Sequence, residues 1–181
     1  ACCKDKQTTK TYWANTFDQG LAWAQDAYFD ITTANAGGFD MQLSFWQNED
    51  PSAYILLNFD AKKNFTGYAR AKFYYPLAQF INYVRPGMRR IDVQSGNNTI
   101  LASAYIDSLG QQLAMVVINN SKQPQEMNLQ FTQKNTPKSF QVIRSSRTEN
   151  MTNLGKISLS SDTSRIMVPA ESVTTYLGTL K

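Results

Sequence analysis

Two adjacent carboxylates, Glu49 and Asp50, stand in a polar turn at residues 46–51 and could supply acid–base chemistry. Carboxylates are the groups to consider, because the chain contains no histidine. A Ser-His-Asp triad, a Cys-His nucleophile and a histidine-based zinc site are therefore excluded. Two carboxyl groups that act on one bond must approach it from opposite sides, about 5 Å apart, and neighbours in a turn cannot. Glu49 is a catalytic candidate by residue type, but its position favours a solvent-exposed turn carboxylate.

Three polar or aromatic residues could contact a sugar. Trp46 and Gln47 precede the two carboxylates, and Trp13 lies near the start of the chain. The face of an indole can stack on a pyranose ring, and an amide can hydrogen-bond to hydroxyl groups. The alternative is that both tryptophans pack in the core, as large aromatic residues often do.

Composition excludes several classes of protein. The formal net charge of +4 comes from scattered Lys and Arg residues, and no helix carries a basic stripe with aromatic residues between the charges, so nucleic-acid binding is not expected. No segment approaches the roughly 18 apolar residues of a membrane span. At 42% hydrophobic residues the chain can bury a core. It begins at Ala1, which suggests that an upstream segment has been removed.

Cysteines and glycosylation sequons bear on the compartment. The only cysteines, Cys2 and Cys3, are neighbours and rarely form an unstrained disulfide with each other. They are either free or bonded to another chain, so they leave the compartment open. Asn-x-Ser/Thr sequons favour a secreted glycoprotein, although each could be an unoccupied polar turn. The sequons begin at Asn64, Asn97, Asn119 and Asn150.

The first half of the chain alternates between helices and short strands. Asp18 is the expected N-cap of a helix that runs to about Ile31. Residues 39–47 alternate as a strand, residues 54–59 form a short apolar segment, and residues 60–64 read as a polar loop. A second helix carries an apolar stripe at spacings of three and four residues. The stripe consists of Phe73, Leu77, Phe80, Ile81 and Val84.

The pattern changes after the sequence Arg85-Pro86-Gly87, which stops the second helix. From residue 88 onward the chain shows only short strands separated by turn residues. Residues 101–107 and 113–119 are expected to form a hairpin, and the apolar run at residues 113–118 fits a strand covered on both faces. About eight such strands predict an antiparallel sandwich.

Three motifs, in this order, resemble the C-terminal half of family 30 glycoside hydrolases. Phe45-Trp46-Gln47 is similar to the end of that family's last barrel strand, and residues 73–92 are similar to the joint between its barrel and its sandwich. The segment from Val168 to Gly178 is similar to its terminal Pro-Ala-x-Ser-Val-x-Thr strand. The resemblance covers the chain from about Thr11 and is strongest to fungal xylanases and β-1,6-galactanases.

This resemblance implies a retaining endo-glycosidase, which needs one protonated and one ionised carboxyl group about 5 Å apart. In the family these are glutamates after barrel strands four and seven. Barrel strands one to six have no counterpart in this sequence, and residues 12–17, where the second glutamate would stand, contain none. The resemblance therefore implies ancestry from such enzymes without their catalytic pair. Glu49 lies in a sequence similar to the family's Asn-Glu-Pro segment. It follows the strand that matches barrel strand eight, however, and not strand four.

The expected fold is α+β: a C-terminal antiparallel β-sandwich of about eight strands, joined by a helix to a partial (β/α) barrel remnant. We expect a loose tail at residues 1–10, the barrel remnant with its linker helix at residues 11–87, and the sandwich at residues 88–181. The expected function is that of a secreted, carbohydrate-active piece of a family 30-like enzyme acting on cell-wall polysaccharide, inactive alone. The alternative is a non-catalytic secreted protein that binds a glycan or a partner through the sandwich.

The expected partner is a polysaccharide or oligosaccharide. No cofactor or metal is expected. A second chain could complete the barrel or bond to Cys2 or Cys3, since too few strands are present to close a barrel.

Overall fold

The computed structural model describes residues 15–39, 45–47, 53–96, 98–132, 136–159 and 163–180. The predictions made for Cys2, Cys3, Trp13, Glu49 and Asn97 lie outside these residues. In chain order the elements are α1 (Phe17–Thr32), β1 (Phe45–Gln47), β2 (Ile55–Phe59), β3 (Phe65–Arg70), α2 (Tyr74–Tyr83), β4 (Arg89–Ile91), β5 (Ile100–Ile106), β6 (Gln112–Asn119), β7 (Gln125–Gln130), β8 (Ser139–Ser145), β9 (Thr152–Ser158), β10 (Thr163–Val168) and β11 (Ser172–Thr179).

A six-stranded antiparallel sheet forms the middle of the molecule, with strand order β4-β5-β6-β11-β8-β9. The two central strands, β6 and β11, pair along their whole length. β6 is buried on both faces from Leu113 to Asn119, which confirms that its apolar run lies between two layers. The predicted hairpin is also confirmed, because β5 and β6 pair in antiparallel register.

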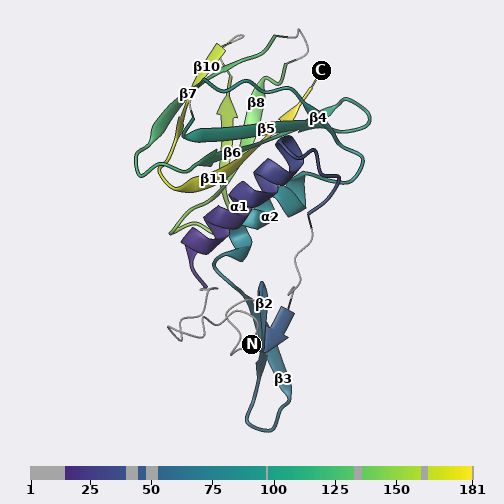
Figure 1. Ribbon diagram of the computed structural model, residues 1–181, viewed down its shortest axis with the longest axis vertical. Helices are drawn as coiled ribbons and strands as arrows, with labels where there is room; N and C mark the ends of the chain where they lie inside the picture. Colours follow the sequence, from purple (N-terminus) through teal and green to yellow (C-terminus); the bar gives the residue numbers. More distant parts are fainter. Residues whose placement is uncertain are drawn as a thin grey trace.

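A second sheet of two strands, β7 and β10, covers one face of the six-stranded sheet (Figure 1). The residues of β7 alternate between half-buried and exposed, as the spacing of Met127 and Leu129 predicts. These residues pack on a core that includes Phe140 and Tyr176, whose rings lie 5.8 Å apart. Six strands facing two strands make the predicted eight-stranded sandwich.

Helices α1 and α2 cover the opposite face of the six-stranded sheet (Figure 1). Phe73, just before α2, is fully buried, and its ring lies edge-on 4.8 Å from the ring of Trp23 in α1. Gly20 of α1 permits this approach, because a Cβ atom there would lie 2.6 Å from the Cα atom of Phe73. The helices share their core with Val116 and Val173, so they belong to the same body as the sandwich. The division at residue 87 stays a prediction.

Buried hydrogen bonds fix α2 on the sheet. Gln79 is fully buried, and its Nε2 atom donates to Ser145 Oγ at 2.9 Å while its Oε1 atom accepts from Thr175 Oγ1 at 2.7 Å. Ser145 Oγ in turn donates to the carbonyl of Tyr75 at 3.0 Å. Because both ends of the Gln79 amide have a hydrogen-bond partner, the cost of burying this side chain on the inner face of the helix is offset.

The helix ends agree only partly with the sequence-based prediction. The N-cap of α1 is Thr16, whose side chain accepts from the amide of Gln19, so the prediction that Asp18 caps the helix is wrong. Asp18 instead lies in the first turn. α2 ends at Tyr83, and Gly87, with a φ angle of 88°, makes the turn into β4 that the Arg-Pro-Gly sequence predicts.

A small three-stranded sheet, in the order β1-β2-β3, extends away from the sandwich (Figure 1). β1 pairs with β2 in parallel, and β2 and β3 form an antiparallel hairpin. The sequence predicted residues 60–64 as a loop but missed β3, which is exposed along nearly all its length. The sheet is open, with β1 and β3 as its outer strands among the described residues.

Candidate functional site

Two of the residues predicted to contact a sugar lie on β1. The backbone of Trp46 pairs with Leu56, and that of Gln47 pairs with Leu57. β1 is therefore an outer strand of the small sheet rather than part of the sandwich. Trp13 and Glu49, the other candidates, lie outside the described residues. The structure thus places Trp46 and Gln47 on one strand and leaves their relation to Trp13 as a prediction.

The small sheet also carries exposed aromatic side chains that the sequence analysis did not select. They are Phe45, Phe59, Phe65 and Tyr68, with exposed fractions between 41% and 62%. Phe65 and Tyr68 were not recognised as candidates for a binding surface, because β3 itself was not predicted. The only signal in the sequence is the frequency of aromatic residues on both sides of the polar loop.

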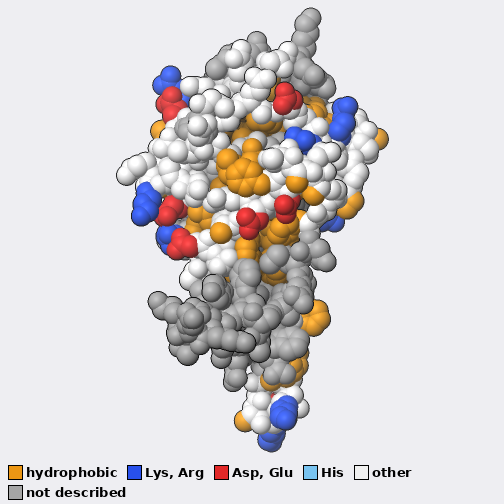
Figure 2. Space-filling model, viewed as in Figure 1, with side chains coloured by type: hydrophobic (Ala, Val, Ile, Leu, Met, Phe, Trp, Pro, Cys, Tyr) orange, Lys and Arg blue, Asp and Glu red, His pale blue; other side chains and the backbone are white. Residues whose placement is uncertain are grey.

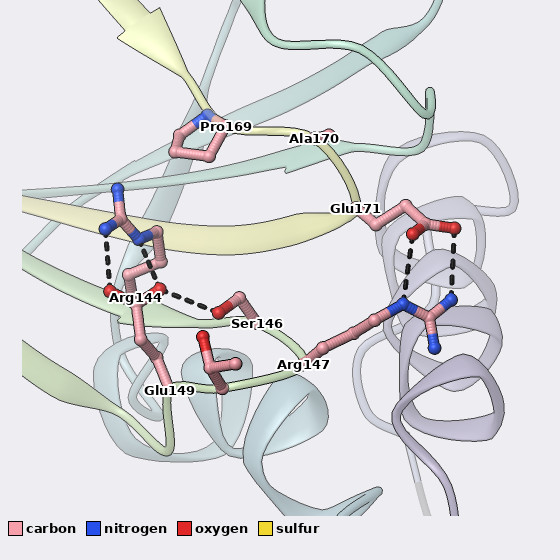
Figure 3. Close-up of a pocket in the computed structure, with 8 residues that line it drawn as sticks. Arg144, Ser146, Arg147, Glu149, Pro169, Ala170 and Glu171 are labelled. Atoms are coloured by element: carbon pink, nitrogen blue, oxygen red, sulfur yellow. Dashed lines mark hydrogen bonds and ion pairs between the residues drawn. The ribbon is translucent and has the colours of Figure 1, made fainter.

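A shallow hollow of about 330 Å³ lies where α1 meets the turns of the sandwich (Figure 3). Acidic and basic side chains meet in it. Its lining consists of Arg144, Ser146, Arg147, Thr148, Glu149, Pro169, Ala170 and Glu171. Arg147 and Glu149 come from the turn between β8 and β9, and Glu171 comes from the turn between β10 and β11.

Arg147 joins three parts of the chain in this hollow. Its guanidinium donates to Glu171 at 3.0 and 3.2 Å and to Asp18 of α1 at 2.5 and 3.2 Å. It also lies 5.9 Å from the centre of the Phe17 ring. The φ angle of Glu171 is 44°, in the left-handed region, and its amide donates to the carbonyl of Ser121. These contacts fasten the start of α1 to the sandwich.

Glu149 forms the second ion pair of the hollow (Figure 3). Its carboxylate accepts two hydrogen bonds from Arg144, at 2.6 and 2.7 Å, and a third from Ser146 Oγ at 2.7 Å. These bonds, led by those from Arg144, hold the pKa of Glu149 below its usual range. A carboxyl group that stays ionised cannot donate a proton as a general acid at neutral pH. Glu149 therefore binds Arg144 and Ser146 as an ionised carboxylate, and we call these three residues the polar clasp.

Glu149 should make stability depend on pH. Because its folded-state pKa is lowered, its contribution is fully present above the unfolded pKa and is lost as pH falls through the folded pKa. We expect Glu149→Gln to lower the free energy of unfolding by about 1–2 kcal/mol at pH 7, from the loss of charge-assisted hydrogen bonds. The deficit relative to the wild type should shrink between about pH 5 and pH 3. Urea unfolding at several pH values measures it.

The matched control is Glu126→Gln, which removes a carboxylate from a more exposed pair with Arg165. This variant should match the wild type within about 0.5 kcal/mol, because exposed ion pairs contribute little. If Glu149→Gln lowers the free energy of unfolding by the same amount at every pH, the ionised form of Glu149 does not contribute to stability.

The sequons differ in accessibility. Asn64, at the tip of the β2–β3 hairpin, and Asn150, after the clasp, are both exposed. Asn119 is fully buried, and its Nδ2 atom donates to the carbonyls of Gln123, Val168 and Pro169 at 2.9–3.1 Å. In this fold the atom that would carry a glycan is buried, so Asn64 and Asn150 are the accessible sequons among the described residues, and glycosylation itself stays a prediction. Asn97 lies outside the described residues.

The described residues contain no group of three or more His, Cys, Asp or Glu side chains that could hold a metal ion. Neither of the described helices is long and apolar enough to cross a membrane.

Neither a known family model nor a curated protein matches this sequence. Solved structures do match its fold. A GH30 endoxylanase from Clostridium papyrosolvens C71 is similar with a TM-score of 0.73 and 20% identity, over 94% of this chain and 40% of that chain. The catalytic domain of GH30 xylanase C from Talaromyces cellulolyticus is similar with a TM-score of 0.71 and 17% identity, over 93% and 38%.

A conserved exported protein from Bacteroides fragilis is also similar, with a TM-score of 0.72 and 22% identity, over 89% of this chain and 33% of that chain. The chain thus spans well under half the length of these three proteins. The likeness confirms, at the level of fold, the resemblance to the C-terminal part of family 30 glycoside hydrolases that the sequence indicated.

Proposed function

We propose that this chain is a secreted, glycan-contacting piece of a family 30-like glycoside hydrolase that acts on cell-wall polysaccharide and has no catalytic activity alone. The observation that supports this proposal is the fold, which matches nearly all of this chain to about two fifths of a GH30 endoxylanase. Retaining hydrolysis needs two carboxyl groups about 5 Å apart. The strands that carry them in the family have no counterpart in this sequence, and Glu149 is held in the clasp.

Sugar contact is assigned to Trp46 and Gln47 of β1 and to Trp13. Trp46 offers a stacking face and Gln47 a hydrogen-bonding group, which are the two kinds of contact that bind a sugar. Among the described residues β1 is an outer strand of the small sheet, which supports access for a long polymer. Secretion is supported by the two exposed sequons at Asn64 and Asn150.

We expect the isolated chain to bind insoluble xylan or β-1,6-galactan and to release no sugar from either. Trp46→Ala should weaken binding about tenfold, since losing one stacked aromatic residue at an interface commonly costs more than 1 kcal/mol. Affinity electrophoresis in gels that contain each polysaccharide measures the binding.

The control is Phe29→Ala, which removes an exposed aromatic residue from α1. It should bind like the wild type. Equal binding by wild type, Trp46→Ala and Trp13→Ala would reject the assignment of these tryptophans, and absence of binding to any polysaccharide would reject the proposed function.

A second candidate function is the binding of another protein chain. It is favoured by the place of β1 as an outer strand among the described residues, where it could pair with strands of a chain that completes the barrel. Cys2 or Cys3 could then bond to that chain. A complex that separates on reduction and has no affinity for polysaccharide would favour this candidate.

A further inference from the structure

The helices leave one end of the six-stranded sheet uncovered. α2 contacts Ser145 of β8 and Thr175 of β11 through its buried Gln79. Residues two apart along a strand share a side of the sheet, so Leu177 and Thr179 lie on the same side as Thr175. Leu177 is half-buried and Thr179 is exposed. This side of the sheet is therefore open beyond the end that α2 covers.

A second hollow, of about 310 Å³, lies on this open side. Leu177 pairs with Gln141, and Gln141 pairs with Lys156, so the three side chains form a row across β11, β8 and β9. The hollow shares no residue with the one beside α1. Its lining consists of Gln112, Lys138, Ser139, Gln141, Lys156, Leu177, Gly178 and Thr179.

The charge of this second hollow is positive. Its lining includes two lysines and no acidic residue. Lys138 and Lys156 are exposed, and neither forms an ion pair with another described residue. Along the left edge of Figure 2, by contrast, basic side chains lie beside acidic ones. Asp107, which precedes the Gln112 strand, is directed elsewhere, because its carboxylate accepts from the amides of Gln111 and Gln112 at 2.7 and 2.9 Å.

Neutral side chains in this hollow can also donate hydrogen bonds to an anion. The hydroxyl groups of Ser139 and Thr179 have no hydrogen-bond partner among the described residues. Gln141 is held in place, because its Nε2 atom donates to the carbonyl of Gly155 at 2.8 Å and to the side chain of Asn153. The hollow thus offers two ammonium groups, each with three donors, and two hydroxyl groups, each with one.

We propose that the second hollow binds a phosphate or sulfate group, a tetrahedral oxyanion that carries a charge of about −2 at neutral pH. Charge complementarity selects this ligand, because two ammonium groups balance two negative charges and a carboxylate supplies only one. A neutral sugar is not selected, since the lining contains no aromatic ring on which it could stack. Leu177 adds an apolar surface for the carbon atoms of an ester. The inference is independent of the proposed function and uses neither Trp46 nor Gln47.

The test titrates the full chain with inorganic phosphate at constant ionic strength and follows the backbone amides by two-dimensional NMR. We expect the amides of Gln141, Leu177 and Thr179 to shift with one dissociation constant, on the order of 1 mM. Lys138→Gln/Lys156→Gln should bind phosphate at least about tenfold more weakly, because the charge-assisted hydrogen bonds are lost.

Three other anions define the ligand. Inorganic sulfate should bind within about threefold of phosphate, and acetate should bind at least about tenfold more weakly, because it has one charge and two oxygens. Glycerol 2-phosphate distinguishes the two sources of the group. Tighter binding of this ester than of inorganic phosphate supports an ester as the ligand, and weaker binding supports the free ion.

The matched control is Lys63→Gln/Lys122→Gln, which removes the same charge from two exposed lysines outside the hollow. It should bind phosphate like the wild type. Trp46→Ala should do so too, which separates this site from the sugar contacts. All variants should keep the wild-type melting temperature in the absence of phosphate, since substitutions of exposed side chains change stability little.

Wild-type affinity for phosphate in Lys138→Gln/Lys156→Gln would overturn the inference, and so would shifts confined to amides outside the hollow. Acetate that binds as tightly as phosphate would overturn the choice of a tetrahedral oxyanion. These results do not depend on any polysaccharide, so the proposed function can fail while phosphate binding stands, and the reverse.

Discussion

Replacing Phe73 with alanine should lower the free energy of unfolding by about 3–5 kcal/mol, the usual effect of removing a fully buried phenylalanine. The side chain is completely buried, and its ring meets those of Trp23 and Tyr54 at 4.8 and 5.3 Å. Alanine would leave a cavity at the junction of α1, the small sheet and α2, and rigid neighbours on three sides would not fill it. Urea unfolding, followed by tryptophan fluorescence, measures the change.

Phe65→Ala is the matched control, because it removes the same ring from an exposed position. It should change the free energy of unfolding by less than about 0.5 kcal/mol. A small effect at Phe73 would mean that the joint between the helices and the small sheet does not contribute to the stability of the folded chain.

Gly20→Val should destabilise the protein by about 3 kcal/mol, through overpacking rather than a cavity. A Cβ atom at this position would lie 2.6 Å from both the Cα and the carbonyl oxygen of Phe73 and 2.9 Å from Pro76 Cγ. Backbone atoms cannot move aside as a flexible side chain can, so α1 would have to shift away from α2. The melting temperature should fall by roughly 10 °C, at 2–4 °C for each kcal/mol in a chain of this size.

Ala22→Val supplies the comparison for Gly20, since Ala22 is exposed on the same helix. The cost there should be about 0.5 kcal/mol, from the helix propensity of valine alone. Similar melting temperatures for the two variants would contradict the close approach of α1 and the segment before α2.

The sandwich could be predicted from the sequence because its strands have strong local patterns. The uninterrupted apolar run of β6 indicated burial on both faces, and alternation indicated the half-buried strand β7. β3 was missed for the opposite reason. It is exposed on nearly every side chain and contains Gly67 at a bulge, so neither alternation nor an apolar run marks it.

Contacts between distant residues account for the other differences. Thr16 and Asp18 are both good N-cap residues, and only the ion pair of Asp18 with Arg147, 129 residues away, shows why Asp18 has another role. The sequon at Asn119 is a local motif, whereas the burial of its amide depends on Val168 and Pro169. The burial of Gln79 likewise depends on distant partners, Ser145 and Thr175.

The candidate binding surfaces were only partly predictable. Trp46 and Gln47 were selected through a family resemblance and their residue types, and the structure places both on β1. The side of the small sheet on which Phe65 lies could not be predicted, because the bulge at Thr66 reverses it. A rule that counts every second residue along β3 puts Phe65 and Tyr68 on opposite faces.

The most direct test of the account is an assay of binding and hydrolysis on one preparation of the isolated chain. Xylan and β-1,6-galactan are incubated with the protein, the bound fraction is measured, and the reducing sugar released is followed over hours. We expect saturable binding of the protein to at least one polysaccharide and no release of reducing sugar above a buffer blank. Sugar release that scales with protein concentration would contradict it, because the chain would then possess a catalytic pair of carboxyl groups.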